Sequence, residues 1–183
     1  NDTRNRANAV LGQSFKSNGI KFEVHPVHLQ SVITSTMNRL NGPLGASDRL
    51  QSMTHLLMES ATLSRFQAEH VLRIGLLKFS PKTLDDWYDA FGGIGADEID
   101  EYDITWEERT GRPSGLTNIK STLGNKLSNL SREMFDRQVN TWIVRTYANS
   151  LGIALLQAGR LLSGCRDQDM GYHIDLPLSI DSE

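Results

Sequence analysis

Histidines are the side chains of this sequence that could carry acid–base or metal chemistry. His25 and His28 stand close enough to share a metal ion, but the sequence indicates no third ligand beside them. His55 and Glu59 fall on one face of a predicted helix, where the carboxylate could orient the imidazole as a base. His70 lies on a predicted apolar stripe, a setting typical of a hydrogen-bonded core histidine. We therefore predict no metal site and assign no catalytic residue.

The single cysteine and the glycine-rich segments complete no catalytic or nucleotide-binding motif. Cys165 has Arg166 beside it, which favours the thiolate, but no base that would activate the thiol is evident. Residues 92–95 are followed by two carboxylates that would repel a phosphate, and residues 111–115 place their serine out of register with a nucleophile turn. No cofactor is predicted, and an unrecognised hydrolase or transferase is kept only as the last alternative.

The length and composition of the chain limit the class of protein to which it can belong. The chain has 183 residues, of which 38% are hydrophobic, and this predicts one soluble domain with a core that needs no disulfide. The apolar run at residues 151–157, which Arg145 and Arg160 flank, is far shorter than the ~18–20 apolar residues of a membrane helix. One cysteine cannot form an internal disulfide, so we expect an intracellular, cytoplasmic protein.

Charge alternates in blocks along the chain, although the net charge is only −3. Residues 1–80 carry +4 and residues 81–110 carry −8, after which residues 111–160 carry +5 and residues 161–183 carry −4. Two interpretations follow. Neighbouring blocks could neutralise one another within the fold, or opposite faces could stay apart and dock on another copy or partner.

Cations recur through the predicted helices of the second positive block, and such a row is typical of phosphate contacts. The candidate nucleic-acid-binding residues are Arg112, Lys120, Lys126, Arg132, Arg137 and Arg145. Only Glu133 and Asp136 oppose them, and Trp142 or Tyr147 could stack on bases if exposed. RNA or DNA binding by this 112–145 surface is therefore the alternative function.

Apolar residues recur with the period of an α-helix and predict an all-α bundle of about six to eight helices. We expect helices over 3–17, 26–40, 47–61, 62–78, 80–91, 96–109 and 116–130. Residues 96–109 also fit the alternation of a strand, and helix is preferred. Ser47, Thr62 and Ser80 are the expected N-caps.

The last predicted helix is too long for a compact domain. A continuous helix over 128–163 would reach about 54 Å, whereas a compact chain of this length is roughly 40 Å across. It should therefore break near Gly152 or project from the domain. We place the helical domain at residues 1–163 with a hinge or loop at 110–115, followed by an irregular acidic tail at 164–183.

Small residues on this last helix form rows that let another helix approach closely. The predicted interface residues are Trp142, Ala148, Leu151, Gly152, Leu155 and Ala158. The close partner is another helix of the same chain or, if the helix projects, a second molecule that covers its apolar stripe.

Our leading hypothesis is a non-enzymatic interaction or self-assembly domain of the adaptor or scaffold type. Its 116–162 surface would bind a protein or another copy, with the acidic 85–108 face as the electrostatic complement.

Overall fold

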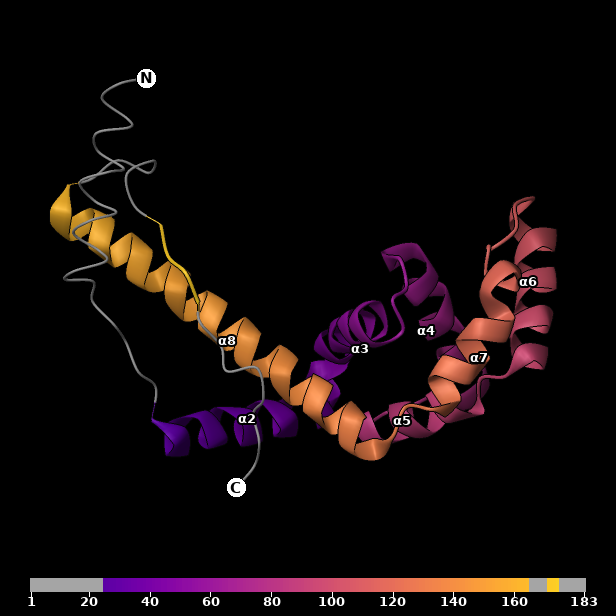
Figure 1. Ribbon diagram of the computed structural model, residues 1–183, viewed down its shortest axis with the longest axis horizontal. Coiled ribbons are helices and arrows are strands. Elements are labelled where there is room, and N and C mark those ends of the chain that lie inside the picture. The colour runs from indigo at the N-terminus through magenta and orange to yellow at the C-terminus, as the bar shows by residue number, and fades with distance from the viewer. Residues whose placement is uncertain (1–24, 165–170, 175–183) are drawn as a thin grey trace, which may run out of the picture. The chain divides into compact units, whose positions relative to one another are not determined.

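The computed structural model describes residues 25–164 and 171–174, and within those ranges the chain forms helices and no strand (Figure 1). The helices are α2 (Pro26–Asn41), η1 (Pro43–Gly45), α3 (Ala46–Ser60), α4 (Arg65–Phe79), α5 (Leu84–Gly93), α6 (Ala96–Thr110), η2 (Thr117–Ile119), α7 (Lys120–Ser128) and α8 (Arg132–Ser163). The all-α prediction is confirmed, including helix rather than strand over 96–109. The expected helix over 3–17 and Cys165 lie outside the described residues.

The helices begin at different polar residues from those expected. Ser64, not Thr62, caps α4, because its side chain accepts the N–H of Gln67 while Gln67 accepts the N–H of Ser64. Thr83, not Ser80, caps α5, and Ser80 instead ends α4 with a left-handed φ of 48°. These two predictions chose a serine or threonine two or three residues too early, because only the path of the backbone decides which one has extended dihedral angles at a helix start.

Glycine replaces the expected serine cap at the start of α3. Ser47 lies inside this helix, and Gly45 precedes it without a side-chain hydrogen bond. A Cβ on Gly45 would clash with the carbonyl oxygen of Arg39. No residue with a side chain fits there, because η1 brings the end of α2 directly against the start of α3.

Residues 32–143 form one compact unit, whose core collects side chains from α2 to α8. The largest fully buried ones include Met53, Leu57, Ile74, Trp87, Phe91, Ile99, Leu123 and Phe135. Gly75 of α4 lets Trp87 of α5 approach, since a Cβ on Gly75 would lie 2.7 Å from the indole ring. A buried tryptophan against a glycine thus sets the spacing between these two helices.

The loop between α6 and η2 is anchored by Asp103. The Asp103 carboxylate accepts the backbone N–H of Ser114 at 2.7 Å and the hydroxyl of Thr117. Ser114 and Leu116 are both buried. Burial by itself would raise the pKa of Asp103, but the hydrogen bonds from Ser114 and Thr117 hold it below its ordinary value. The hinge at 110–115 stays a prediction.

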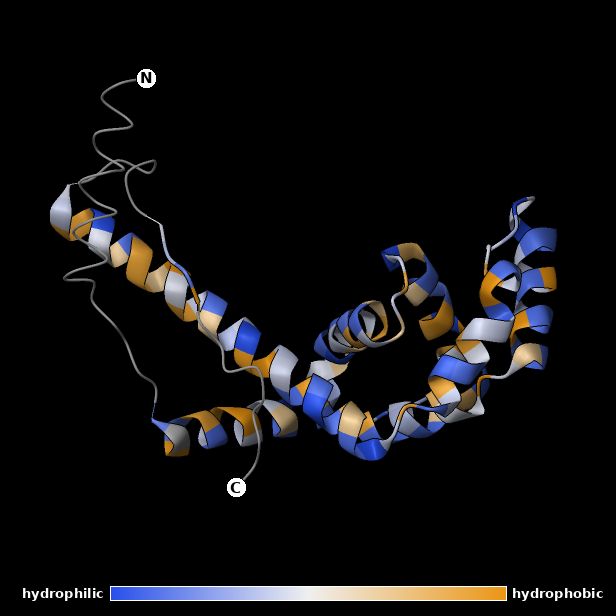
Figure 2. Ribbon diagram, viewed as in Figure 1, coloured by the Kyte–Doolittle hydropathy of each residue, from blue (hydrophilic) through white to orange (hydrophobic). Residues whose placement is uncertain are grey.

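The long last helix is confirmed, and α8 is continuous through Gly152, so the break considered near that residue does not occur. At ~1.5 Å per residue its 32 residues span about 48 Å. Figure 2 shows hydrophobic and hydrophilic residues alternating along its whole length. Residues 132–143 belong to the compact unit above, whereas the described residues from 144 onward group with residues 25–31 in a second unit. No helix among the described residues is both long and apolar enough to cross a membrane.

Candidate interaction surfaces

Four of the apolar residues on α8 lie on one face of the helix. Leu151, Leu155, Ala158 and Leu162 are spaced by four, three and four residues, which keeps them in one row at 3.6 residues per turn. We call this row the α8 stripe. Leu151 and Leu155 are half-buried and Ala158 is exposed. Leu162 is 89% exposed, and its neighbour Leu161 is 86% exposed. The stripe therefore becomes more exposed toward the end of the helix.

The predicted close approach at Gly152 is made by the chain itself, through a residue that we did not predict. The ring of Tyr172 lies against Gly152, where a Cβ would stand only 2.6 Å from two ring carbons. Figure 1 draws the short segment 171–174 running alongside α8. Ala148, one turn earlier, is half-buried. The small residue at position 152 thus accommodates an aromatic ring.

Trp142 does not share the face of the α8 stripe. It precedes Leu151 by about two and a half turns, which places it on the opposite side of the helix. Its ring lies 6.1 Å from the ring of His55 on α3, within the larger unit. The six predicted interface residues are therefore not brought to one surface.

The predicted nucleic-acid-binding cations are largely engaged by other groups of the protein. Lys120 pairs with Asp100 at 2.7 Å, and Lys126 donates to the carbonyl of Ala61 at 2.8 Å. Arg137 pairs with Glu133 at 2.7 Å. Arg112 and Arg145 are exposed. The six side chains do not form a continuous row of cations available to phosphate.

Arg132 is the most connected of these cations. Its guanidinium pairs with Asp85 on α5 and with Asp136 one turn along α8, and it lies 5.4 Å from the ring centre of Tyr88. The hydrogen bond from Arg132 to Asp85 raises the pKa of the guanidinium. This ion pair and those of Lys120 and Lys78 join the acidic block to basic segments on either side, which supports local neutralisation of the charge blocks.

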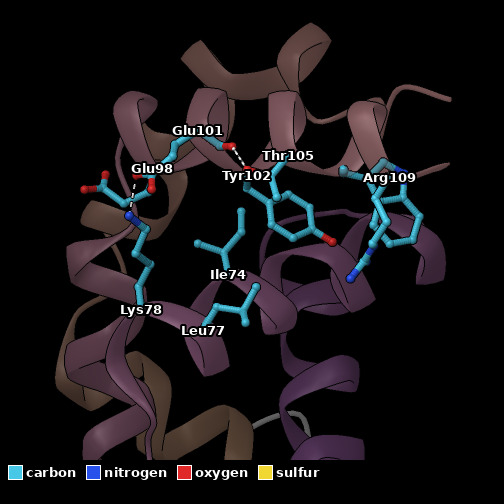
Figure 3. A pocket seen from close by; sticks show the side chains of 9 residues that line it. Ile74, Leu77, Lys78, Glu98, Glu101, Tyr102, Thr105 and Arg109 are labelled. Atoms are coloured by element: carbon cyan, nitrogen blue, oxygen red, sulfur yellow. Dashed lines mark hydrogen bonds and ion pairs between the residues drawn. The ribbon is translucent and has the colours of Figure 1, made fainter. Parts of the chain in front are cut away.

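A groove of about 330 Å³, which no pattern in the sequence predicted, lies between α4 and α6. We call it the α4–α6 groove; its lining residues are Ile74, Leu77, Lys78, Glu98, Glu101, Tyr102, Thr105, Trp106 and Arg109. Figure 3 shows Ile74 and Leu77 from α4 facing Tyr102 from α6, with Lys78 reaching across to the carboxylates. The ion pair between Lys78 and Glu101 ties the two walls together at one side.

Aromatic rings pack behind this groove around His70. The His70 Nδ1 atom lies 2.7 Å from the hydroxyl oxygen of Tyr102, and its ring meets Phe66 and Trp106 edge-on. Burial, followed by the charge of Arg73, lowers the pKa of His70. The prediction of a hydrogen-bonded core histidine is confirmed at this position.

The remaining histidines have separate partners. The His25 ring accepts the N–H of Val27, and His28 Nε2 lies 3.0 Å from the hydroxyl oxygen of Tyr147. Among the described residues no three histidines, cysteines or carboxylates are grouped as a metal would require. Neither His55 nor Glu59 lines the α4–α6 groove.

Comparisons of the chain with protein-family models, curated proteins and solved structures found no match. The function is therefore inferred from the surfaces of the protein.

Proposed function

We propose that this chain is a helical self-assembly domain and that the α8 stripe is the surface by which it binds a second copy. The observation that carries the proposal is the exposure of Leu162 and Leu161 at 89% and 86% on a regular helix. Fully burying a leucine side chain stabilises a contact by about 1.5–3 kcal/mol. Two adjacent exposed leucines beside a half-buried apolar row supply the centre of a small interface.

The composition of α8 favours burial of this face. Between residue 137 and the end of the helix at Ser163 there is no aspartate or glutamate. Docking therefore buries no carboxylate of this part of α8, and an unpaired buried carboxylate is costly in an interface. Arg145 and Arg160 give the second half of the helix a positive charge.

The contacts of the cations support this function over nucleic-acid binding. A phosphate that approached Lys120, Arg132 or Arg137 would have to displace carboxylates already paired with them. Each exchange replaces one ion pair by another, so the net gain is small. The exposed leucines of α8 have no such competitor among the described residues.

The proposal is tested by measuring the mass of the full chain by sedimentation over a wide range of concentrations. We expect reversible association that Leu162→Asp weakens at least tenfold, a loss of about 1.4 kcal/mol. The matched control is Leu44→Asp, because Leu44 is 96% exposed on η1 and is not part of α8. A chain that stays monomeric at every concentration would exclude self-assembly.

A further inference from the structure

We infer that the α8 stripe of one copy docks into the α4–α6 groove of another copy, so that molecules associate head to tail. This inference rests on the proposed self-assembly and names the surface that receives the stripe. The occupant is a second copy of this chain, and the receiving surface belongs to the compact unit of residues 32–143.

The groove offers apolar side chains that no other part of the described chain covers. Leu77 is 73% exposed along its wall, while Ile74 and Tyr102 are buried at its base and Trp106 is half-buried. The volume of about 330 Å³ is at the lower end of that of small-molecule pockets, which suits a few apolar side chains. Leu161 and Leu162 on the other copy are of the size and chemistry that would fill it.

Charge favours this pairing of surfaces. Three lysines or arginines against one glutamate give α4 a net charge of +2, while seven carboxylates against one arginine give α6 −6. The two helices α4 and α6 thus carry −4 together. The whole of α8 carries four arginines against Glu133 and Asp136, which gives it a net charge of +2. Opposite net charge on α8 and on the pair of helices α4 and α6 attracts the copies.

Pairing of α8 with α8 of another copy is less favourable, both in charge and in the space available for close packing. It would bring two positive surfaces together. The closest helix–helix approach would use Gly152, and the ring of Tyr172 already fills that space. The groove has neither obstacle.

Head-to-tail docking leaves one free stripe and one free groove on every assembly, so growth continues beyond a dimer unless the rotation closes a ring. This property allows a test with two variants. Leu162→Asp damages the stripe and keeps the groove, whereas Leu77→Asp damages the groove and keeps the stripe. Both side chains are mostly exposed, so both variants should fold with unchanged helix content by circular dichroism.

We expect each variant alone to associate at least tenfold more weakly than the unmodified full chain by sedimentation. An equimolar mixture of the two should form a heterodimer and stop there, because it contains one working stripe and one working groove. Ile104→Asp is the matched control, since Ile104 is 61% exposed on α6 but does not line the groove. It should assemble as the unmodified chain does.

The outcomes separate this inference from the proposed function. If L162D prevents assembly while L77D assembles normally, self-assembly stands and the groove is not its receiving surface. If both variants are defective but their mixture remains monomeric, the two surfaces do not meet and the inference is overturned. An unmodified chain that never associates overturns both proposals.

Discussion

Tyr172 stacks its ring on Gly152 so closely that a Cβ on the glycine would lie 2.6 Å from ring carbons Cδ2 and Cε2. A glycine in the middle of a helix normally destabilises it by about 0.5–1 kcal/mol relative to alanine. Here the missing side chain lets the segment 171–174 lie against α8. The helix therefore lacks the stability that alanine would give it, and the chain gains the contact between Gly152 and Tyr172.

A double-mutant cycle on this pair should show strong coupling. We expect Gly152→Ala to stabilise the Tyr172→Ala protein by about 0.5–1 kcal/mol, because the helix gains alanine and no ring stands in the way. In the unmodified chain the same substitution should bring no gain, since the ring must move. Urea denaturation followed by circular dichroism measures both free energies of unfolding.

Gly124 on α7 provides the control for this cycle. A Cβ there would meet nothing within 4 Å, so Gly124→Ala should stabilise both backgrounds equally. Additive effects of G152A and Y172A would show that the ring and the glycine are not in contact.

The close contact between Gly75 and Trp87 predicts that a larger residue at position 75 destabilises the core. We expect Gly75→Ala to cost about 1–3 kcal/mol, because the added methyl would stand 2.7 Å from the fully buried indole. Gly92→Ala, near the end of α5 where a Cβ meets nothing within 4 Å, should cost nothing and serves as the comparison. Equal midpoints of thermal unfolding for the two variants would contradict the close packing of α4 on α5.

The burial of His70 predicts that the stability of the folded protein depends on pH. Burial lowers its pKa below 6.5, with Arg73 acting in the same direction and with Asp103 and Glu69 opposing. The unfolded chain therefore binds a proton more readily than the folded one. Stability from this group is complete above about pH 6.5 and is lost as the pH falls through the lowered pKa. Urea midpoints measured between about pH 7 and pH 5 should fall accordingly.

His70→Gln should remove this part of the pH dependence, because glutamine can still bond to the Tyr102 hydroxyl but does not titrate in this range. The exposed His55 is the matched control, and His55→Gln should keep the slope of the unmodified chain. An unchanged slope in H70Q would assign the pH dependence to other groups.

The hydrogen bonds of Asp103 predict that removing its carboxylate loosens the loop after α6. We expect Asp103→Ala to cost about 1–3 kcal/mol and to speed cleavage within residues 110–115 by a protease of broad specificity. The reason is that Ser114, which is buried, would lose the acceptor of its backbone N–H. Glu107→Ala removes an exposed carboxylate from the same helix and should leave cleavage unchanged. If D103A is cleaved no faster, the loop is held by packing alone.

Helix positions were largely predictable, whereas helix starts were not. The spacing of apolar residues depends only on 3.6 residues per turn, so it located α2 to α8 with small shifts at their ends. Thr62 and Ser64 are equally able to cap α4 by chemistry. The capping box with Gln67 forms only at Ser64, because Thr62 takes a left-handed φ of 53° in the turn that leads into the helix.

The candidate surfaces were only partly visible in the sequence. The α8 stripe follows from one helix, and its row of apolar residues was predicted. Trp142 was grouped with it although its ring meets His55, a contact that needs α3 to be placed. The α4–α6 groove could not be predicted, because it exists only where Leu77 and Tyr102, far apart in the chain, come to face each other.

The amino-acid order by itself determined that this chain is helical and where its apolar faces run, because both properties arise within a few turns of backbone. Only the tertiary structure decided which charges meet. Arg132 pairs with Asp85 across 47 positions, and His70 bonds to Tyr102 across 32. Electrostatic and hydrogen-bond energies depend on distances in space, and the spacing of residues along the chain does not contain those distances until the helices pack.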